Sequence, residues 1–221
     1  MRRTKIPWCD YTINPVKGLC PMACEYCYAR RMYKRFKWNP EIRFEPEILL
    51  DLSVVPNGSK VFIGSTIELF HKDTIQWMPY ILDCIKRAPW QTSILLTKQP
   101  QNLIGFEFPD NCWVLVSATN QTQYNAGIVG LSVVKARVKG FSIEPFLGEI
   151  YPEGAYDLSE ADWLIIGSQT QPTKHPRREC VERILLRADE ANIPVFIKEP
   201  LASHINIQRQ EFPSVESDIK L

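Results

Sequence analysis

Residues 60–65 read KVFIGS, the first of six short apolar runs that decide the fold. The other five stand at 92–97 (TSILLT), 113–117 (WVLVS), 138–143 (VKGFSI), 163–167 (WLIIG) and 195–198 (VFIK). Most of these runs are apolar along their whole length, which is typical of strands buried on both faces. With a further strand expected near residues 10–14, the sequence predicts about seven strands.

Stretches with helical spacing separate the strands, at Thr74–Arg87 and Arg178–Asn192, with a weaker candidate at Asn120–Leu131. Pro79 is expected to bend the first of these helices. The alternation of strand and helix predicts an α/β fold with a parallel sheet. About seven strands are too few for a closed eight-stranded barrel. We therefore expect a partial (βα)6-type open barrel with mostly parallel strands, and a flat doubly wound sheet is the alternative.

The length of 221 residues predicts one domain over residues 1–221, with a polar, loosely held C-terminal tail from about 208 to 221. Hydrophobic residues make up 45% and charged residues 23%, an ordinary composition for a soluble globular protein. No apolar run is long enough to span a membrane, and no apolar stretch follows the basic N-terminus as in a secretory signal. We therefore expect a cytoplasmic protein with no membrane partner.

Residues 20–27 read CPMACEYC and contain three of the seven cysteines, in the spacing C-x3-C-x2-C. Such spacing lets one loop place three thiolates around a single metal centre, and thiolates favour iron–sulfur clusters or zinc. The usual [4Fe–4S] cluster takes four cysteines, so three leave one iron open. We expect the loop at residues 15–28 to hold one cluster through Cys20, Cys24 and Cys27.

Two other readings of the cysteines remain open. Cys9 could complete a structural zinc site, although a zinc ribbon usually has two C-x2-C pairs and this chain has one. The protein would then be a zinc-stabilised, non-catalytic nucleic-acid-binding module. An electron-transfer protein is disfavoured, because such proteins generally complete the ligand set with a fourth cysteine.

This cysteine spacing, with the aromatic Tyr26 directly before the third cysteine, resembles the signature of the radical S-adenosylmethionine (SAM) superfamily. The resemblance implies a partial (βα)6 barrel, a [4Fe–4S] cluster and SAM bound at the open iron. It also implies that an electron from an external donor, such as a flavodoxin- or ferredoxin-like protein, cleaves SAM to a 5′-deoxyadenosyl radical. That radical abstracts hydrogen from a substrate, here unidentified.

A closer resemblance, to the phage gene-product 37/68 family, covers most of the chain. It rests on the segments TINPVKGLCPMACEYCYA, IGSTIELFHKD, RAPWQTSILLTKQP, WVLVSATNQ, SIEPFLGEI, DWLIIGSQT and IPVFIKE. These segments are long and stand in the right order. The resemblance supports the cofactors more than the reaction, because it implies no particular substrate.

The resemblance to radical SAM enzymes also implies which residues contact the cofactor. Its candidates here are Tyr26, which could shield the cluster, and the polar or small residues at the strand ends: Gly64, Ser65, Thr66, Glu68, Ser117, Asn120, Gly140 and Glu144. Gly140 would permit close approach of the backbone to adenine. Ligands of parallel α/β sheets bind at this end of the strands.

The candidate catalytic residues are Lys98, Glu144, Lys198 and His71. Lys98 and Lys198 follow strands and could pair with a phosphate or carboxylate of the substrate. The favoured alternative for each lysine is a structural partner of Glu144 or Glu199. His71 could donate a proton or contact the substrate, or it could be an ordinary hydrogen-bonded histidine.

Positive charge gathers around the cysteines, because residues 1–40 carry a net +7 whereas the whole chain carries +1. Residues 29–38 read ARRMYKRFKW, a helical pattern in which Tyr28, Met32 and Phe36 can face the core. Basic residues interleaved with aromatic ones are a footprint of nucleic-acid binding, so a nucleotide or nucleic acid is a possible substrate. The alternative is a solvated helix face balanced by the acidic remainder of the chain. The sequence gives no indication of the oligomeric state.

Overall fold

The computed structural model describes residues 3–214. Its strands are β1 (Tyr11–Ile13), β2 (Val16–Lys17), β3 (Arg43–Phe44), β4 (Lys60–Ile63), β5 (Thr92–Thr97), β6 (Cys112–Ser117), β7 (Val138–Ile143), β8 (Trp163–Ile166), β9 (Gln169–Thr170), β10 (Thr173–Lys174) and β11 (Val195–Ile197). Its α-helices are α1 (Tyr28–Phe36), α2 (Met78–Lys86), α3 (Gln121–Ser132), α4 (Arg178–Glu190) and α5 (Leu201–Ile205). Short 3₁₀ segments lie at Pro46–Ser53, Ile75–Trp77, Pro100–Leu103 and Gly154–Tyr156.

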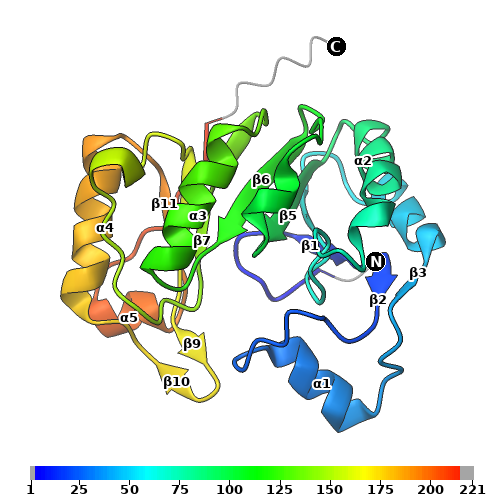
Figure 1. The fold of residues 1–221 in the computed structure, drawn as a ribbon, viewed down its shortest axis with the longest axis horizontal. Coiled ribbons are helices and arrows are strands. Elements are labelled where there is room, and N and C mark those ends of the chain that lie inside the picture. Colours follow the sequence, from blue (N-terminus) through cyan, green and yellow to red (C-terminus); the bar gives the residue numbers. More distant parts are fainter. Residues whose placement is uncertain (1–2, 215–221) are drawn as a thin grey trace.

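Seven strands form one curled sheet in the order β1-β4-β5-β6-β7-β8-β11, and every neighbouring pair is parallel. The sheet is an open half-barrel of the α/β class, as the sequence predicts (Figure 1). Each predicted strand is present, with bounds within two residues of those expected.

The two faces of this sheet are covered differently. Helices α2, α3 and α4 pack against one face, where strand and helix side chains form a single large core. The opposite, concave face buries a second cluster that contains no helical residue and includes Trp8, Phe62, Trp113, Trp163 and Phe196. The Trp113 and Trp163 rings meet edge to face with centroids 5.6 Å apart. These rings close the amino-terminal half of the half-barrel and leave its carboxyl half open, so a flat sheet covered by helices on both faces is excluded.

Helix α2 begins later than its sequence pattern suggests. A 3₁₀ turn precedes it, and Pro79 lies in its first turn, where an α-helix has no partner for the missing N–H. The expected bend at Pro79 is therefore wrong, because the proline starts the helix. Helix α3 starts after Asn120, whose side-chain oxygen accepts a hydrogen bond from Gln123 N at 3.1 Å.

The C-terminal segment is held more firmly than expected. Ile197 N donates to Arg209 O at 2.8 Å and Glu211 N donates to Val195 O at 3.1 Å, so residues 209–211 pair with the edge strand β11. Trp163 Nε1 also donates to Glu211 O, at 2.9 Å. The prediction of a loose tail from residue 208 is wrong for residues 209–211, because their backbone pairing with β11 covers an otherwise open sheet edge. Residues 215–221 lie outside the described part of the chain.

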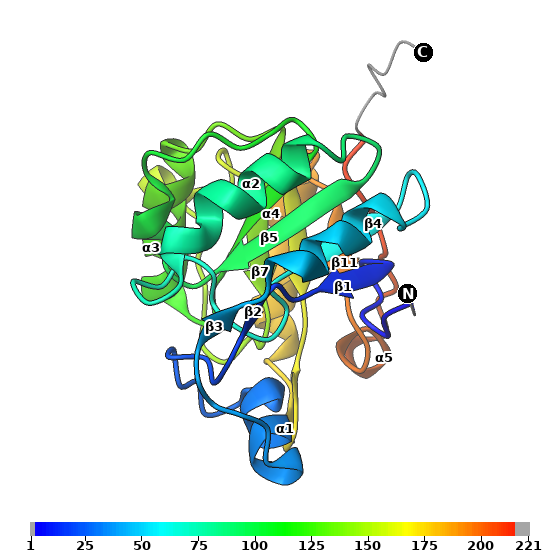
Figure 2. The same cartoon turned by 90° about the vertical axis from the view of Figure 1, so that its right-hand side faces the viewer.

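Three small elements lie at the carboxyl end of the sheet: two short strand pairs, which the sequence pattern did not indicate, and helix α1, which the pattern at residues 29–38 predicts. Strands β2 and β3 pair with each other, as do β9 and β10, and both pairs are antiparallel. Helix α1 stands beside the β9–β10 hairpin at this end of the molecule (Figure 2). Within residues 3–214, none of the helices is long and apolar enough to cross a membrane.

Replacing Gly140 by alanine tests the packing of strand β7 against β8. A Cβ atom at Gly140 would lie 2.0 Å from Trp163 O, and this neighbouring backbone cannot move away without breaking the pairing of the two strands. We expect Gly140→Ala to lower the free energy of unfolding by about 1–3 kcal/mol in urea titrations. The control is Ser93→Ala, which removes a buried hydroxyl that has no hydrogen-bond partner in the described chain, and we expect no loss. Equal stability of Gly140→Ala and the native protein would contradict this account.

The ion pair between Arg209 and Glu211 predicts how stability depends on pH. Hydrogen bonds from the Arg209 guanidinium hold the pKa of Glu211 below its ordinary value of 4.5. A carboxyl whose pKa is lower in the folded state stabilises the fold above pH 4.5, and this contribution disappears as pH falls through the folded pKa. We expect Glu211→Gln to unfold more easily at neutral pH and to show a shallower loss of stability in acid. Parallel acid limbs for the variant and the native protein would refute this role.

Candidate functional site

A cavity of about 1500 Å³ opens at the carboxyl ends of the parallel strands. Its outer walls are the cysteine loop, helix α1 and the β9–β10 hairpin. The sheet contributes the strand-end side chains of Thr12, Asn14, Lys98, Ser117, Ser142, Glu144, Ser168 and Lys198. Ligand pockets commonly measure roughly 300–1,000 Å³, so this cavity has room for more than one small molecule.

The three clustered cysteines line this cavity, and none of them forms a disulfide. Their loop is held from both sides. The backbone N–H of Glu68 points at Cys20 Sγ at 3.4 Å, and Arg30 Nη2 donates to Cys20 O at 3.0 Å. Gly18 N donates to Tyr33 Oη at 2.8 Å, which ties the start of the loop to helix α1.

The thiols are half-buried and have not converged on a common centre. Among residues 3–214, no group of three or more His, Cys, Asp or Glu side chains is arranged to hold a metal ion. Burial raises the pKa of the Cys20 thiol, so without a metal this thiol is protonated at neutral pH. Metal binding would have to displace that proton and draw the loop together.

Cys9, the fourth cysteine considered for a zinc site, lies elsewhere. It is buried in the aromatic cluster of the concave face and does not line the cavity. Desolvation raises the pKa of Cys9 to about 12, which makes its thiol a poor metal ligand. Three thiols are therefore positioned to bind a metal centre in the cavity, and the Cys9 thiol is not.

Glu68 is a structural centre of the site. Its Oε1 accepts hydrogen bonds from Phe70 N at 3.0 Å and Thr97 Oγ1 at 2.7 Å, and its Oε2 accepts from Lys98 N at 2.7 Å. The carboxylate is thus occupied, and it joins the loop after β4 to the end of β5. Glu68 lines the cavity, and it contacts the cysteine loop through its backbone N–H at Cys20 rather than through its carboxylate.

Glu144 and Lys198 form an ion pair across the ends of β7 and β11. Both side chains are mostly buried and line the cavity. Gly167 makes room for the pair, because a Cβ there would lie 3.1 Å from Glu144 Cγ. Lys98 also lines the cavity, and its ammonium group forms no hydrogen bond or ion pair with the described residues. The two candidate lysines therefore differ, since Lys198 is paired and Lys98 is available to an anion.

The floor of the cavity carries a buried donor with no acceptor. Trp8 lines the cavity at 2% exposure, and its Nε1 has no hydrogen-bond partner in the part of the chain that is described. Its ring packs on Phe62 with centroids 5.0 Å apart. A buried N–H usually finds a partner, so this donor is available to a ligand or an ordered water molecule.

Most of the predicted cofactor-contacting residues meet in the cavity, namely Tyr26, Gly64, Ser65, Thr66, Glu68, Ser117 and Glu144. Gly64 has φ +81°, a conformation that favours glycine, and Tyr28 Oη donates to Ser65 O at 3.0 Å. Burial and the neighbouring Cys24 raise the pKa of Tyr26, so its hydroxyl stays neutral. Ser142, register partner of Ser117 in the next strand, also lines the cavity. It lies two residues before Glu144, so strand alternation could have identified it.

Three predicted residues lie outside the cavity. The side-chain oxygen of Asn120 caps helix α3. His71 turns back on its own loop, where its Nδ1 accepts from Asp73 N at 3.2 Å. Gly140 allows the close approach of the Trp163 backbone in the neighbouring strand. None of the three is among the residues that line the site.

Helix α1 and the β9–β10 hairpin form the rim of the cavity. Arg31 Nη1 donates to Gln171 O at 2.8 Å, which joins the helix to the hairpin across the mouth. Behind the hairpin, Ser168 Oγ and His175 Nδ1 are 2.8 Å apart, and the His175 ring stacks on His204 with centroids 4.0 Å apart. Desolvation and the neighbouring His204 lower the pKa of His175 below its ordinary value of 6.5, which favours the uncharged form of the His175 ring at neutral pH.

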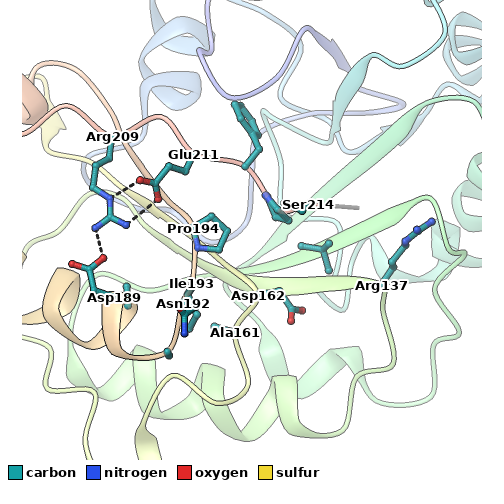
Figure 3. Close-up of a pocket in the computed structure, with 15 residues that line it drawn as sticks. Arg137, Ala161, Asp162, Asp189, Asn192, Ile193, Pro194, Arg209, Glu211 and Ser214 are labelled. Atoms are coloured by element: carbon teal, nitrogen blue, oxygen red, sulfur yellow. Dashed lines mark hydrogen bonds and ion pairs between the residues drawn. The ribbon is translucent and has the colours of Figure 1, made fainter. Parts of the chain in front are cut away.

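A second hollow, of about 1010 Å³, lies near the start of β7 and the end of helix α4 (Figure 3). Arg209 donates there to Asp189 Oδ1 at 2.7 Å and to both oxygens of Glu211 at 2.9 Å. These contacts hold the C-terminal segment in place. The Arg209 guanidinium is fully engaged, and the thiols lie in the other cavity, so we assign the chemistry to the cavity at the carboxyl ends.

Comparison with solved structures identifies two similar proteins. One is "Spore photoproduct lyase complexed with dinucleoside spore photoproduct", and the other is a cysteine-to-serine mutant of spore photoproduct lyase. The TM-score is 0.59 for both, at 12% and 13% sequence identity, and each match covers 89% of this chain and 78% of the other. At this identity the likeness shows a shared fold and no more.

Two sequence comparisons complete the picture. No curated protein matches the chain. A family model with the description "Protein of unknown function (DUF5131)" matches residues 3–209. This match does not confirm the resemblance to the phage gene-product 37/68 family, which stays a prediction.

Replacing Glu68 by glutamine tests its structural role. An amide in this place must turn its NH2 group toward at least one of the three donors that the carboxylate accepts. We expect Glu68→Gln to lower the free energy of unfolding by about 1–3 kcal/mol in urea titrations. Glu47→Gln, at an exposed glutamate with no side-chain partner in the described chain, is the control and should change nothing measurable. If the two variants were equally stable, the carboxylate would not organise the site.

Proposed function

The chain belongs to the family described as "Protein of unknown function (DUF5131)", and from its site we propose that it is a radical SAM enzyme. In this proposal Cys20, Cys24 and Cys27 hold a single [4Fe–4S] cluster. The observation that carries it is the position of three free thiols, from one loop, at the open carboxyl mouth of a parallel half-barrel. Spore photoproduct lyase, whose fold the chain shares, is a radical SAM enzyme.

The donor set fits this cofactor better than it fits structural zinc. Three thiols line one cavity, whereas Cys9 is buried away from them, so a tetrahedral four-cysteine site cannot form without moving the core of the concave face. A cluster held by three thiolates keeps one iron open to SAM, and the bound pair supplies radical hydrogen abstraction.

Cavity residues would hold and shield the cofactors. Gly64 and Ser65 line the cavity, and the Ser65 carbonyl accepts a hydrogen bond from Tyr28 Oη of helix α1. Ser117 and Ser142 offer hydroxyl groups from adjacent strands, and Trp8 Nε1 offers a donor at the floor. Tyr26, next to Cys27 and buried by its neighbours, would exclude water from the cluster.

Charged residues would orient the substrate. The Glu144–Lys198 pair fixes a carboxylate at the mouth and neutralises most of its charge, whereas Lys98 presents an unpaired ammonium group. We infer that Lys98 holds a phosphate or carboxylate of the substrate and that Lys198 holds the Glu144 side chain in place. His71 has no part in this arrangement, because it lies outside the cavity.

A nucleotide or nucleic acid is the proposed substrate class. The neighbouring structure is described as complexed with a dinucleoside spore photoproduct, and residues 1–40 of this chain carry a net +7. The sequence has a single cysteine cluster, so electrons must come from a separate donor, for which a flavodoxin- or ferredoxin-like protein is suited.

The test is the metal content and the paramagnetic resonance spectrum of the anaerobically reconstituted protein. We expect about four irons and four sulfides per chain, and a reduced spectrum that changes when SAM is added. Cys24→Ala should lose most of the iron. Cys84→Ala, at a half-buried thiol of helix α2 away from the cavity, is the matched control and should retain it.

Two results would reject this function. Stoichiometric zinc lost in Cys9→Ala would identify the four-cysteine zinc site. An iron–sulfur spectrum indifferent to SAM would identify an electron carrier.

A further inference from the structure

We propose that the exposed end of helix α1 binds single-stranded nucleic acid and leads it into the cavity. The surface consists of Lys34, Arg35, Phe36, Lys37 and Trp38, and we call it the α1 platform. The inference rests on the proposed function in one respect, because it names the substrate class of the same site. Its binding step requires neither cluster nor SAM and can be measured separately.

The platform presents two stacked aromatic rings to solvent. Phe36 is 52% exposed and Trp38 is 44% exposed. Their ring centroids are 5.5 Å apart and their planes are inclined by only 24°. The expectation that Phe36 faces the core is therefore wrong, as it is for Tyr28, which is 46% exposed. Aromatic faces left open in this way are stacking surfaces for unpaired bases.

The backbone after the helix builds this stack. Lys37 has φ +51°, and Trp38 N donates to Tyr33 O at 3.2 Å, so the chain reverses at the end of the helix. The reversal brings the Trp38 ring back over Phe36 and against the edge of Tyr33, with centroids 5.3 Å apart. Three aromatic rings are thereby fixed in a row from solvent toward the cavity.

Unneutralised positive charge surrounds the rings. In the described structure, Lys34, Arg35 and Lys37 form no ion pair, and the Arg35 guanidinium lies 5.3 Å from the centre of the Phe36 ring. Cations in the last turn stabilise a helix dipole, which explains a basic residue here. The dipole does not explain the exposed rings, and an anionic partner that also stacks explains both.

The other two arginines of the basic segment serve the fold. Arg30 donates to Cys20 O and Arg31 to Gln171 O, so they anchor helix α1 to the cysteine loop and the hairpin. The basic residues of α1 therefore divide into an inner pair that fixes the helix and an outer group on the platform. Only the outer group is available to a partner.

The platform is continuous with the cavity. Trp38 itself lines the cavity, as do Lys17 and Arg43 from the β2–β3 pair beside it. A strand stacked on Phe36 and Trp38 would thus place its next nucleotide at the mouth that the cysteines line. The bases of a duplex are already stacked and paired, so the platform favours single strands, and a base within a duplex would first have to be flipped.

The experiment measures binding of fluorescein-labelled oligothymidylate and oligouridylate, each about 12 nucleotides long, by fluorescence anisotropy. We expect each single strand to bind more tightly than the matched duplex. Comparing the affinities of the DNA strand and the RNA strand then shows which of the two nucleic acids the platform prefers. Trp38→Ala should weaken binding roughly 5- to 100-fold, whereas Trp38→Phe should preserve it because a ring remains. Trp90→Ala, at a 54% exposed tryptophan away from the cavity, is the control.

Salt dependence tests the charges independently. Each phosphate neutralised on a single strand contributes about 0.7 to the slope of log K against log salt concentration. Removing two cations in the double variant Lys34→Gln/Lys37→Gln should therefore reduce the slope by about 1.4. The control is Lys86→Gln/Lys135→Gln, at two exposed lysines that form no ion pair within the described chain, and it should leave the slope unchanged.

Failure of this inference differs from failure of the proposed function. Duplex binding as tight as single-strand binding, no binding of either probe, or unchanged affinity in Trp38→Ala would overturn the platform even if the cluster and its response to SAM are present. Tight binding to anionic vesicles in place of oligonucleotides would assign the surface to a membrane and also overturn it. A zinc-loaded protein that still binds single strands through Trp38 would reject the radical chemistry and keep the platform.

Discussion

The carboxylate of Glu68 is the contact on which the site depends. It accepts one hydrogen bond from Phe70 N in its own loop and two from the end of β5, and the backbone of the same residue faces Cys20. A buried carboxylate is stable only with such donors, so once it is satisfied the loop after β4 has one position. That position fixes the turn at Gly64 and Ser65, which in turn receives the Tyr28 hydroxyl of helix α1. One ionic group therefore sets the distance between the sheet and the cysteine loop.

Helix α1 extends this order outward to the rim. Its inner side is tied to Gly18, Cys20 and Ser65, and its arginine at position 31 reaches the hairpin. The helix is nine residues long and packs little apolar surface, because Ala29 is its one buried residue. Such a helix is marginal by itself, so tertiary hydrogen bonds must hold it. A change that loosens the cysteine loop should therefore also loosen the rim, which couples the two ends of the site.

The sequence predicts those parts that depend on local patterns. Fully apolar strands that alternate with helices, such as β6, identify the sheet and its parallel strands. The spacing of the three cysteines identifies the loop that carries them. Residues whose role depends on a distant contact were not predictable. The helical spacing of Phe36 with Tyr28 and Met32 matches a core-facing position. Helix α1 is instead held by hydrogen bonds of its polar side chains, and Phe36 lies in solvent. Likewise, the polar segment at 209–211 reads as a tail, although backbone pairing with β11 needs no particular side chain.

Gly140 and Asn120 are residues for which the sequence predicted a ligand contact and the structure shows a contact within the fold. Gly140 lies in a strand and Asn120 follows one, so a ligand contact was expected for both. In the structure Gly140 makes room for the Trp163 backbone, and the Asn120 side chain caps helix α3. By contrast, Lys98, Trp8 and Trp38 have groups or faces that nothing in the described fold satisfies, and all three line one cavity. The fold thus leaves an unpaired ammonium, a buried N–H without an acceptor and an open aromatic stack at one cavity, and each of them is available to a ligand or to water. An anion, a hydrogen-bond acceptor and a flat ring are the features that a nucleotide combines in one molecule.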